Sequence, residues 1–528
     1  MPAATFDVAI VGMGPVGAIT ANLLGMRGLS TLIIDKEVDI HPLPRAIAFD
    51  HEAMRTMQNC GLASEIEPLI APYAPSEYRG VDGKVISRFD TQPAPYPLSW
   101  SPNYVFRQPP FEETLRDGLR RFPNVEVRTP CELVDLVIEE STVRLSLREG
   151  KQDASVCAKY LLAADGGAST VRRLLGITMT SLEFDEPWLV VDVLCSDAAL
   201  ERLPATIIQY CDPARPATYV IGTGNHRRWE IRLLAGEQAG DFNNEEAVWR
   251  LLSRWLDRDD GELWRWAPYE FHAVVADEWR RSRVLLLGDA AHMTPPFMAQ
   301  GMTQGFRDAA NLAWKLERII SARAPEKLLD TYMTERAPHV RATTEIAKGL
   351  GRVICELDRV AAKARDAKML ADFGDPPRVR SRQSLIPNLG GGLILANTDG
   401  AGSIFPQPFV ETIGQPKRLD DLNSGEALLV VRESTDLAES WTSITAECAR
   451  SDLSLIVLSG ATPIAEAGDS RIVEVAPILD AWFAEHRCVA AVVRPDHYVF
   501  GTTDRWSAVA ALCDAWAHSC ACDHGVLN

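Results

Sequence analysis

The feature that most constrains the fold is a glycine-rich turn near the start of the chain. Asp7 to Val11 form a short apolar run, the motif Gly12-x-Gly14-x-x-Gly17 follows it, and a helical pattern continues to Leu24. A second apolar run over residues 30–34 ends at Asp35. Strand, turn, helix and strand in this order make a βαβ unit, which requires a parallel sheet. We therefore predict that the chain opens with a Rossmann-like α/β domain.

This arrangement also predicts a ligand. Glycines let a pyrophosphate approach the backbone, and the start of the helix, where Pro15 stands, favours negative charge. Asp35 can accept hydrogen bonds from ribose hydroxyls. A tight turn without a ligand, or a solvated acid at a strand end, would explain each feature singly but not their spacing. We therefore expect a dinucleotide at the turn and at Asp35.

The charge of the chain excludes some classes of partner. The formal net charge is -18, whereas nucleic acids and anionic membranes require a surplus of Lys and Arg. We therefore expect a small-molecule partner, no nucleic acid and no membrane. Glycines and Pro15 interrupt the apolar stretch over residues 8–24, which fits neither a signal peptide nor a membrane helix. The sequence thus indicates a cytoplasmic protein.

The eleven cysteines include no CxxC pair. Scattered cysteines indicate reduced thiols rather than a disulfide framework or a metal site. A terminal metal site at Cys513, Cys520, Cys522 and His524 is the alternative. We expect no metal.

The length of 528 residues predicts several domains. Strand-like runs between Trp188 and Leu234 indicate a mainly β domain, and a buried-strand pattern over residues 283–287 indicates that the chain then returns to the first domain. We predict four segments: the first part of the cofactor domain over 1–180, a substrate domain over 181–275, the return with long helices over 276–390, and a further α/β domain over 395–528.

Two more motifs bear on the cofactor. Residues 164–172 read ADGGASTVR, which by itself predicts a turn before a capped helix. Residues 287–292 read LGDAAH and precede Pro295-Pro296 and the run QGMTQG over 300–305. An acid at a strand end can hold a sugar hydroxyl, and a loop that feeds a helix N-terminus offers N–H groups to an anion.

Taken in this order, the three motifs resemble the FAD-binding signature of class A flavoprotein monooxygenases, and the run RDAANLAWKL over 307–316 adds specificity. The resemblance points to the branch of 3-(3-hydroxyphenyl)propionate, phenol and polyketide hydroxylases. It covers about residues 5–370 and continues more weakly through 403–408 and 493–496. It implies the fold of p-hydroxybenzoate hydroxylase: a Rossmann-like FAD domain, an inserted β-sheet substrate domain and a thioredoxin-like C-terminal domain without redox cysteines.

The resemblance also implies tightly but non-covalently bound FAD, NAD(P)H as transient co-substrate, O2, and a possible homodimer. In such enzymes a C4a-hydroperoxyflavin hydroxylates a phenolic ring. The residues that would bind FAD, carried over by position, are Gly12, Gly14, Pro15, Gly17, Asp35, Lys36, Arg45, Gln108, Asp165, Gly166, Asp289, Pro296, Gly301, Met302 and Thr303. This chain departs from the family at Ala299, where Gly is common, and at Thr303, where Asn is frequent.

The hydroxylation also requires a base that draws a proton from the substrate phenol and a wall that keeps the site dry. Candidates for the base are His51, then Tyr210 and His226, while Pro295 would wall the pocket beside Pro296. Helix capping or strand packing would equally explain these three side chains. Trp188, Tyr219 and Trp229 belong either to the core or to the substrate pocket. The run Arg228-Trp229-Glu230 resembles the family and is interpreted as structural.

The substrate is expected to be a phenol or a phenolic acid such as a hydroxyphenylpropionate-like compound. A polycyclic aromatic polyketide is the alternative substrate. An FAD-dependent reductase that inserts no oxygen is the alternative reaction, because it could use the same FAD motifs.

Overall fold

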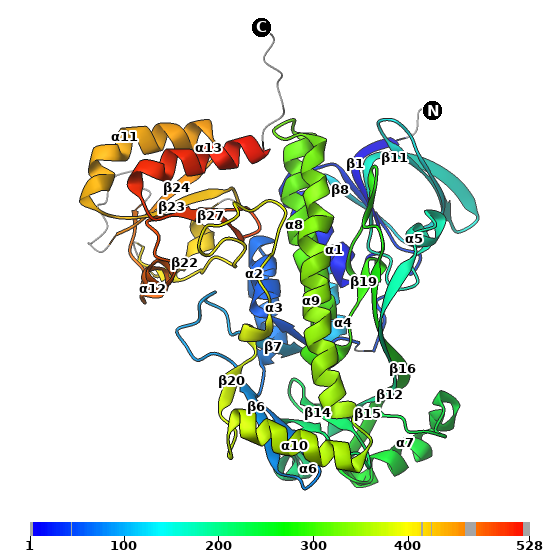
Figure 1. Ribbon diagram of the computed structural model, residues 1–528. Helices are drawn as coiled ribbons and strands as arrows, with labels where there is room; N and C mark the ends of the chain where they lie inside the picture. Colours follow the sequence, from blue (N-terminus) through cyan, green and yellow to red (C-terminus); the bar gives the residue numbers. More distant parts are fainter. Residues whose placement is uncertain (1–3, 44, 413–414, 424, 460–470, 521–528) are drawn as a thin grey trace.

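The computed structural model describes residues 4–43, 45–412, 415–423, 425–459 and 471–520. Two long helices, α8 (Gly301–Ile320) and α9 (Asp330–Cys355), run along the centre of the molecule. The sheet that contains the N-terminal strand lies beside their upper half, and a second large sheet lies at their lower end (Figure 1). The C-terminal unit lies on the other side of the two helices from the first sheet. Within the described residues, no helix is both long and apolar enough to cross a membrane.

The first sheet confirms the predicted Rossmann-like opening. Its main strands are β1 (Ala4–Val11), β2 (Thr31–Ile34), β8 (Val125–Arg128), β11 (Gln152–Ala163), β17 (Arg280–Arg281) and β18 (Val284–Leu286). Helix α1 (Pro15–Met26) connects β1 to β2, and the strands run in the order β17-β18-β11-β1-β2-β8. Strand β1 is parallel to β2 and β11, and β11 is parallel to β18. The chain therefore returns to this sheet at β17 and β18, and β18 lies within the buried-strand pattern predicted over residues 283–287.

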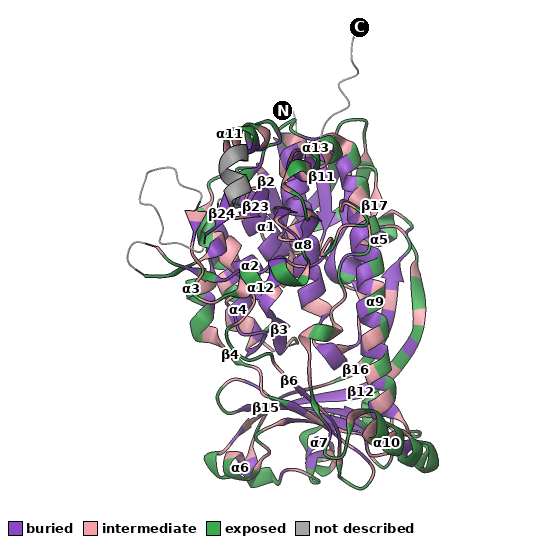
Figure 2. Cartoon of the chain, turned by 60° about the vertical axis from the view of Figure 1, so that its left-hand side comes forward, coloured by how far each residue is buried: buried purple, intermediate pink, exposed green. Residues whose placement is uncertain are grey.

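The second sheet carries nine strands in the order β19-β16-β12-β15-β14-β13-β5-β6-β20. The bounds are β5 (Ser76–Arg79), β6 (Val85–Asp90), β12 (Met179–Cys195), β13 (Ile207–Tyr210), β14 (Ala217–Ile221), β15 (His226–Arg232), β16 (Gly261–Ala276), β19 (His292–Met293) and β20 (Val379–Ser381). Helices α6 (Asp197–Arg202) and α7 (Glu245–Leu252) lie on the far side of the sheet from α8, with exposed outer faces (Figure 2). The sheet is thus covered on both faces.

The predicted segment boundaries stay proposals, because sheet membership does not follow them closely. Strands β5 and β6 come from the first predicted segment, and β20 comes from the third, yet all three pair within the second sheet. These three strands were not singled out from the sequence, and the local alternation of polar and apolar residues carries no information on the partners of a strand.

The C-terminal unit has the thioredoxin-like arrangement that the resemblance implied. Its elements are β23 (Leu428–Arg432), α11 (Thr435–Arg450), β24 (Ser454–Leu458), β25 (Arg471–Ile472), α12 (Ile478–Glu485), β26 (Ala490–Val493), β27 (Val499–Thr503) and α13 (Val509–Cys520). Strand β23 is parallel to β24 and antiparallel to β26, which is antiparallel to β27. Cys522 and His524 of the alternative metal site lie outside the described residues.

Buried ion pairs join this unit to the long helices. The Arg494 guanidinium lies 2.8 Å from the Glu335 carboxylate of α9 and 2.6 Å from Asp496, and all three side chains are almost fully buried. Lys315 of α8 also lies 2.8 Å from Glu335. A buried carboxylate that several cations share holds its element in place, since removing any partner would leave charge uncompensated.

Candidate cofactor and substrate site

A cavity of about 970 Å³ opens at the carboxyl ends of β1 and β2. Open α/β sheets bind ligands at this edge. Nine of the residues expected to contact the cofactor line it: Gly12, Gly14, Pro15, Asp35, Lys36, Arg45, Gln108, Asp165 and Gly166. Residues from four separate stretches of the sequence therefore meet around one hollow.

Each of the three positions in the turn requires glycine for a different physical reason. Gly12 has φ +99°, and a Cβ there would lie 2.4 Å from the Ala164 carbonyl oxygen. A Cβ on Gly17 would lie 1.9 Å from the Gly12 carbonyl oxygen, so this glycine lets α1 pack against the turn. A Cβ on Gly14 would meet no described protein atom within 4 Å, although Gly14 lines the cavity. Absence of a side chain at Gly14 therefore leaves the backbone accessible to a ligand such as a pyrophosphate.

Two acids stand at the rim of the cavity in fixed orientations. The Asp35 carboxylate accepts hydrogen bonds from the backbone N–H groups of Met13 (2.6 Å) and Glu37 (2.9 Å). Asp165 Oδ2 accepts from the N–H groups of Thr170 (2.7 Å) and Val171 (3.1 Å), whereas its Oδ1 is buried without a partner among the described residues. Because buried polar atoms are normally hydrogen-bonded, the free Oδ1 fits a ligand that donates to it.

Gln108 supports the cavity from behind. Its Oε1 accepts from the backbone N–H groups of Arg45 (3.0 Å) and Ala46 (2.8 Å). This bond fixes the segment that leads into β3 (Ala48–Asp50) and α2 (His51–Asn59). The exposed Arg45 side chain is thereby held at the cavity wall.

The remaining expected cofactor residues lie on the loop over residues 288–303, ahead of and within the first turn of α8. Asp289 reaches solvent, yet it lies deep among protein atoms, and this burial raises its pKa. Gly301, the first residue of α8, again has no described atom within 4 Å of a Cβ position. Met302 packs against the first core, and the Thr303 hydroxyl is buried without a described partner. The open start of α8 can thus present backbone N–H groups to a negatively charged group of a bound ligand.

Ala299 shows the cost of the departure from the family. It has φ +56°, in the left-handed region that favours glycine. Ala299 ends the short helix Pro296–Met298 in this conformation, and its N–H group donates to the Pro296 carbonyl oxygen at 2.8 Å. Pro295 is buried and Pro296 is half-buried at this bend.

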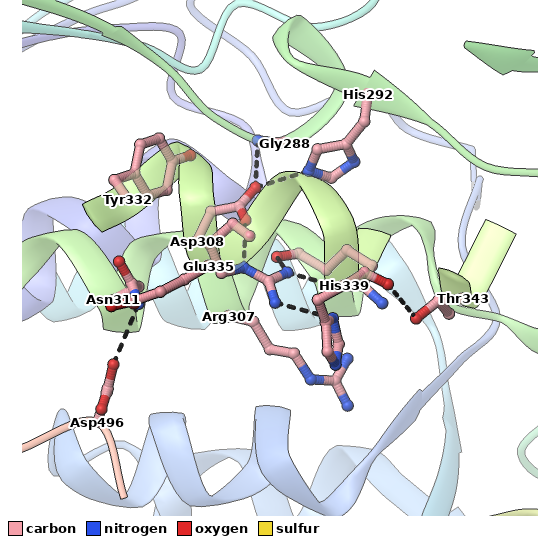
Figure 3. Close-up of polar contacts among 12 residues, drawn as sticks. Gly288, His292, Arg307, Asp308, Asn311, Tyr332, Glu335, His339, Thr343 and Asp496 are labelled. Atoms are coloured by element: carbon pink, nitrogen blue, oxygen red, sulfur yellow. Dashed lines mark hydrogen bonds and ion pairs between the residues drawn. The ribbon is translucent and has the colours of Figure 1, made fainter. Parts of the chain in front are cut away.

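A buried network fixes the loop to α8 and α9 (Figure 3). Asp308 accepts from the Gly288 N–H (3.0 Å) and from Arg336 Nε (2.8 Å), and lies 2.7 Å from His292 Nε2. Burial alone would raise the pKa of Asp308, but the charges of His292 and Arg336 outweigh it and lower the pKa to about 2. A carboxylate that is ionised at neutral pH therefore anchors the loop that carries Asp289.

The three candidate bases occupy different surroundings. His51 lines a cavity of about 250 Å³ with Met298 and Gln300, and its Nδ1 has no described partner. Burial lowers the pKa of His51, which keeps the imidazole neutral. Tyr210 instead packs at 5.5 Å from Trp255 against the α7 side of the sheet, and His226 is fully buried at 2.7 Å from Asp192. The structure thus brings only His51, of the three, next to the loop.

The aromatic residues of the second sheet divide between its faces. Tyr219 and Trp229 pack 5.1 Å apart in the core beneath the sheet, together with residues of α7. Trp188 lies on the other face, where its ring is 5.6 Å from that of Phe297. Phe297 also contacts Phe184 and is 5% exposed, so it serves the core between sheet and loop.

The sheet face that meets the loop carries polar side chains that the sequence did not single out as site residues. Tyr78, Gln209, Thr218 and Glu230 occupy paired positions on four neighbouring strands and are hereafter the polar row. Glu230 had been interpreted as structural. The alternation along β15 was the available sequence signal, because it assigns Glu230 and Trp229 to opposite faces of the sheet. It does not tell which face meets the loop, since that depends on the packing of the two sheets.

Comparisons with known proteins agree with this geometry. Residues 5–347 match the family described as FAD binding domain, and residues 402–518 match the HcaD C-terminal domain. A probable NADH-specific resorcinol 4-hydroxylase of Rhodococcus jostii (strain RHA1) is 36% identical over 519 residues, covering 96% of this chain and 93% of that protein. A 3-(3-hydroxy-phenyl)propionate/3-hydroxycinnamic acid hydroxylase of Burkholderia cenocepacia (strain HI2424) is 34% identical over 514 residues, covering 94% of each chain.

A solved structure shows the same fold. The flavin-dependent monooxygenase PieE, in complex with FAD and substrate, superposes with a TM-score of 0.80 at 20% identity, over 98% of this chain and 99% of that one. The glycine turn, the cofactor-sized cavity and the matched family thus agree along most of the chain. The chain belongs to the family of FAD-dependent aromatic hydroxylases and is a flavoprotein monooxygenase that uses FAD, a nicotinamide donor and O2.

Proposed function

We propose that this protein hydroxylates a monocyclic phenol or phenolic acid, with NADH as the electron donor. Two relatives, named for resorcinol and for 3-(3-hydroxyphenyl)propionate, support this substrate class, and the first supports NADH. The observation that carries the proposal is the meeting of the 295–303 loop with a sheet face that combines apolar and hydrogen-bonding side chains. When bound, FAD supplies an electrophilic oxygen atom, after reduction by the nicotinamide and reaction with O2.

The residues around the large cavity would hold the cofactor. Gly12, Gly14, Pro15 and Arg45 would face the pyrophosphate, while Gly17 acts through packing. Asp35 and Lys36 would face the adenosine ribose, and Gln108, Asp165 and Gly166 the wall between the two halves of the cofactor. Asp289 would bind the ribityl chain, and Gly301, Met302 and Thr303 would donate N–H groups to the pyrimidine edge.

The chain would also keep the reacting ring dry. Ile47 and Val220 belong to one apolar cluster, and Ala299 packs against it. Trp188 and Phe297 close the neighbouring side with an edge-to-face contact, and Pro295 and Pro296 form the bend between them. Excluding water strengthens hydrogen bonds within the site and prevents side reactions of the activated oxygen before it reaches the ring.

The test is NADH and NADPH oxidation by the purified flavoprotein with phenol, resorcinol and 3-(3-hydroxyphenyl)propionate, each product being identified by mass. Stimulated oxidation and a product heavier by one oxygen atom are expected with at least one of these. Oxidation that no phenol stimulates, or stimulation without an oxygenated product, would contradict the proposal. The homodimer implied by the family resemblance belongs to the same proposal, and light scattering of the holoprotein tests it.

A further inference from the structure

We propose that Glu230 is the general base that takes the proton of the substrate phenol, and that the substrate is a neutral dihydroxybenzene rather than a phenolic acid. This inference rests on the proposed hydroxylation of a phenol and deepens it by naming the base and the substrate class. It stands on the position of one buried carboxylate within the second sheet.

The direction of the Glu230 side chain follows from the alternation along β15. Trp229 and Ile231, on either side of it, belong to the core that packs against α7. Successive side chains of a strand point to opposite faces. Glu230 therefore points away from α7, to the face on which Trp188 contacts Phe297.

Contacts on both sides of Glu230 place it beneath the cofactor loop. Arg228, two residues away on the same face, donates to the Arg45 carbonyl oxygen at 2.8 Å. Thr218, the partner of Glu230 on β14, stands two residues from Val220, which clusters with Ile47 near Ala299.

On the other neighbour, β12, the partner of Glu230 is Val190, and Trp188 two residues away contacts Phe297 at 5.6 Å. The carboxylate thus lies between two points at which the sheet touches the FAD-binding segments.

The Glu230 carboxylate is buried and uncommitted. The residue is 7% exposed, and within the described part of the chain no hydrogen bond or ion pair engages its carboxylate. Arg228, two residues away on the same face, instead pairs with Asp192, with Nε 2.7 Å and Nη2 3.1 Å from its oxygens. A buried carboxylate without a partner is costly, so its retention in a sheet indicates a function.

The chemistry of the surroundings suits a base at neutral pH. Burial raises the pKa of Glu230 to about 7, Arg228 opposes the rise and Asp192 adds to it. A base is most effective when its pKa lies near the working pH. The other charged or titratable side chains on this face and on the segments against it include Tyr78, His226, Arg232, Arg265, Tyr269, Arg45 and Glu186.

The proton transfer is balanced within the pair. The phenol O–H bond breaks, its proton joins a Glu230 oxygen, and the bonding electron pair stays on the phenolate oxygen. The ring gains electron density and becomes a better acceptor of an electrophilic oxygen. The total charge of substrate and Glu230 stays at one negative unit, so the step requires no additional cation.

A substrate carboxylate would upset this balance. It would add a second negative charge beside Glu230 and Asp192. The cations of this face are engaged, Arg228 and Arg265 with Asp192 and Arg232 with Glu186, while Arg45 lines the large cavity, where it is proposed to face the pyrophosphate. Like charges in a low-dielectric site repel strongly. A neutral substrate is therefore favoured.

The neighbour of Glu230 in the polar row indicates a second hydroxyl. Thr218 donates to Gln209 Oε1 at 2.6 Å, which turns the Gln209 amide so that its Nε2 remains without a described partner. That N–H group can donate to a second hydroxyl oxygen on the ring. Glu230 and Gln209 stand on β15 and β13, two strands apart, with Thr218 between them. One ring can thus use both groups.

The experiment compares the wild-type holoenzyme with Glu230→Gln and with Glu262→Gln, an exposed glutamate of the same sheet that serves as the matched control. Resorcinol and 3-(3-hydroxyphenyl)propionate are the substrates, and the readouts are product formation, its pH profile, and FAD content. Glu230→Gln should lower kcat for resorcinol by about 10²-fold or more and abolish the rise of activity through neutral pH, because general-base contributions have this size. Glu262→Gln should retain the wild-type rate and profile.

A bypass separates a catalytic role from a structural one. A nitro-substituted phenol that is already ionised at the assay pH needs no base and would meet a second negative charge at an ionised Glu230, so Glu230→Gln should convert it at least as fast as the wild type does. If Glu230→Gln does not retain FAD, Glu230→Asp takes its place, with a slower reaction but a preserved pH profile expected.

Each outcome decides one part of the inference. Full activity of Glu230→Gln with an unchanged pH profile, or loss of that profile in His51→Asn instead, would overturn the role of Glu230. A wild-type preference for 3-(3-hydroxyphenyl)propionate over resorcinol would overturn the neutral substrate class while leaving the hydroxylase intact. No hydroxylation of either by the wild type would overturn the proposed function itself, and this inference with it.

Discussion

The cofactor cavity and the polar row are the two halves of the proposed site, and they are built in opposite ways. The cavity exposes backbone at its centre: Gly12 and Gly14, which have no side chains, and the open start of α1. The polar row is formed by side chains from four strands, among them Gln209 and Glu230. The first half depends on side chains that are absent, whereas the second half depends on which side-chain atoms are present.

This difference teaches why the two halves carry information differently. A backbone site needs particular glycines at fixed spacing in one stretch of chain, so it leaves a continuous motif. A side-chain site on a sheet draws single residues from strands that lie far apart in sequence, so it leaves none. The same difference predicts distinct responses to substitution.

The largest change, a loss in the free energy of unfolding, is expected for a substitution in the half that is built from side chains. Arg228→Met removes the main partner of Asp192, whose carboxylate is fully buried. Breaking a buried ion pair by removing one member typically costs about 3–5 kcal/mol. Urea unfolding should show this loss, whereas Arg250→Met, which removes an exposed pair with Glu246, should leave the unfolding free energy almost unchanged. Equal stability of the two variants would contradict the importance assigned to the Asp192 pair.

The next effect concerns the glycine turn. Gly17→Ala places a methyl group 1.9 Å from the Gly12 carbonyl oxygen, and such overpacking costs about 1–3 kcal/mol or more. Gly14→Ala meets no described protein atom and should leave the unfolding of the FAD-free protein unchanged while weakening FAD binding. Flavin-to-protein ratios and thermal unfolding of both apoproteins separate the two roles. If Gly14→Ala kept its FAD, the assignment of the pyrophosphate site would be wrong.

A smaller effect links both halves through pH. Asp192, on the sheet, and Asp308, behind the loop, both have pKa values of about 2, because burial, which raises the pKa, is outweighed by neighbouring cations. A pKa below the unfolded value of about 3.9 stabilises the fold above that pH, and the stabilisation is lost as the pH falls towards about 2. Each carboxylate should contribute about 2 kcal/mol.

Unfolding free energies measured between neutral and acid pH check this expectation. Asp308→Asn should be less stable at neutral pH and should lose less stability on acidification. Asp372→Asn, at an exposed ion pair with Lys368, should follow the wild-type curve. If the unfolding free energy of the wild type did not decrease as the pH is lowered from about 5, the assigned ionisation would be contradicted.

The smallest effect is expected at the loop between the two halves. Ala299→Gly removes a side chain from a residue with φ +56°. The relief of backbone strain in the folded state should outweigh the entropic cost of ordering a glycine, so the free energy of unfolding should rise by about 0.5–1 kcal/mol. Thermal unfolding should show a gain. Ala364→Gly, at an exposed position within α10 (Arg359–Phe373), should show the opposite sign, with a loss of about 1 kcal/mol.

The fold and half of the site could be predicted from the sequence for a physical reason. The spacing of Gly12, Gly14 and Gly17 after an apolar run allows few backbone arrangements, and strand β1, helix α1 and strand β2 appear where it placed them. The return of the chain at β18 also showed in a buried apolar run.

Candidate bases were less predictable. Tyr210 and His226 have suitable chemistry, but the chemistry of a side chain does not specify the face on which it stands. Tyr210 lies on the α7 side, and His226 is committed to Asp192.

The sequence by itself thus determined the parallel opening sheet, the dinucleotide turn and the flavoprotein family, because these depend on local backbone conformation and on short motifs. Only the tertiary structure decided which face of β15 meets the cofactor loop, and therefore that Glu230 and Gln209, rather than Tyr219 and Trp229, face the reacting ring in the proposed site. The physical reason is that strand alternation defines two faces equally well, and only the packing of α7 on one of them and of the 295–303 loop on the other breaks that symmetry.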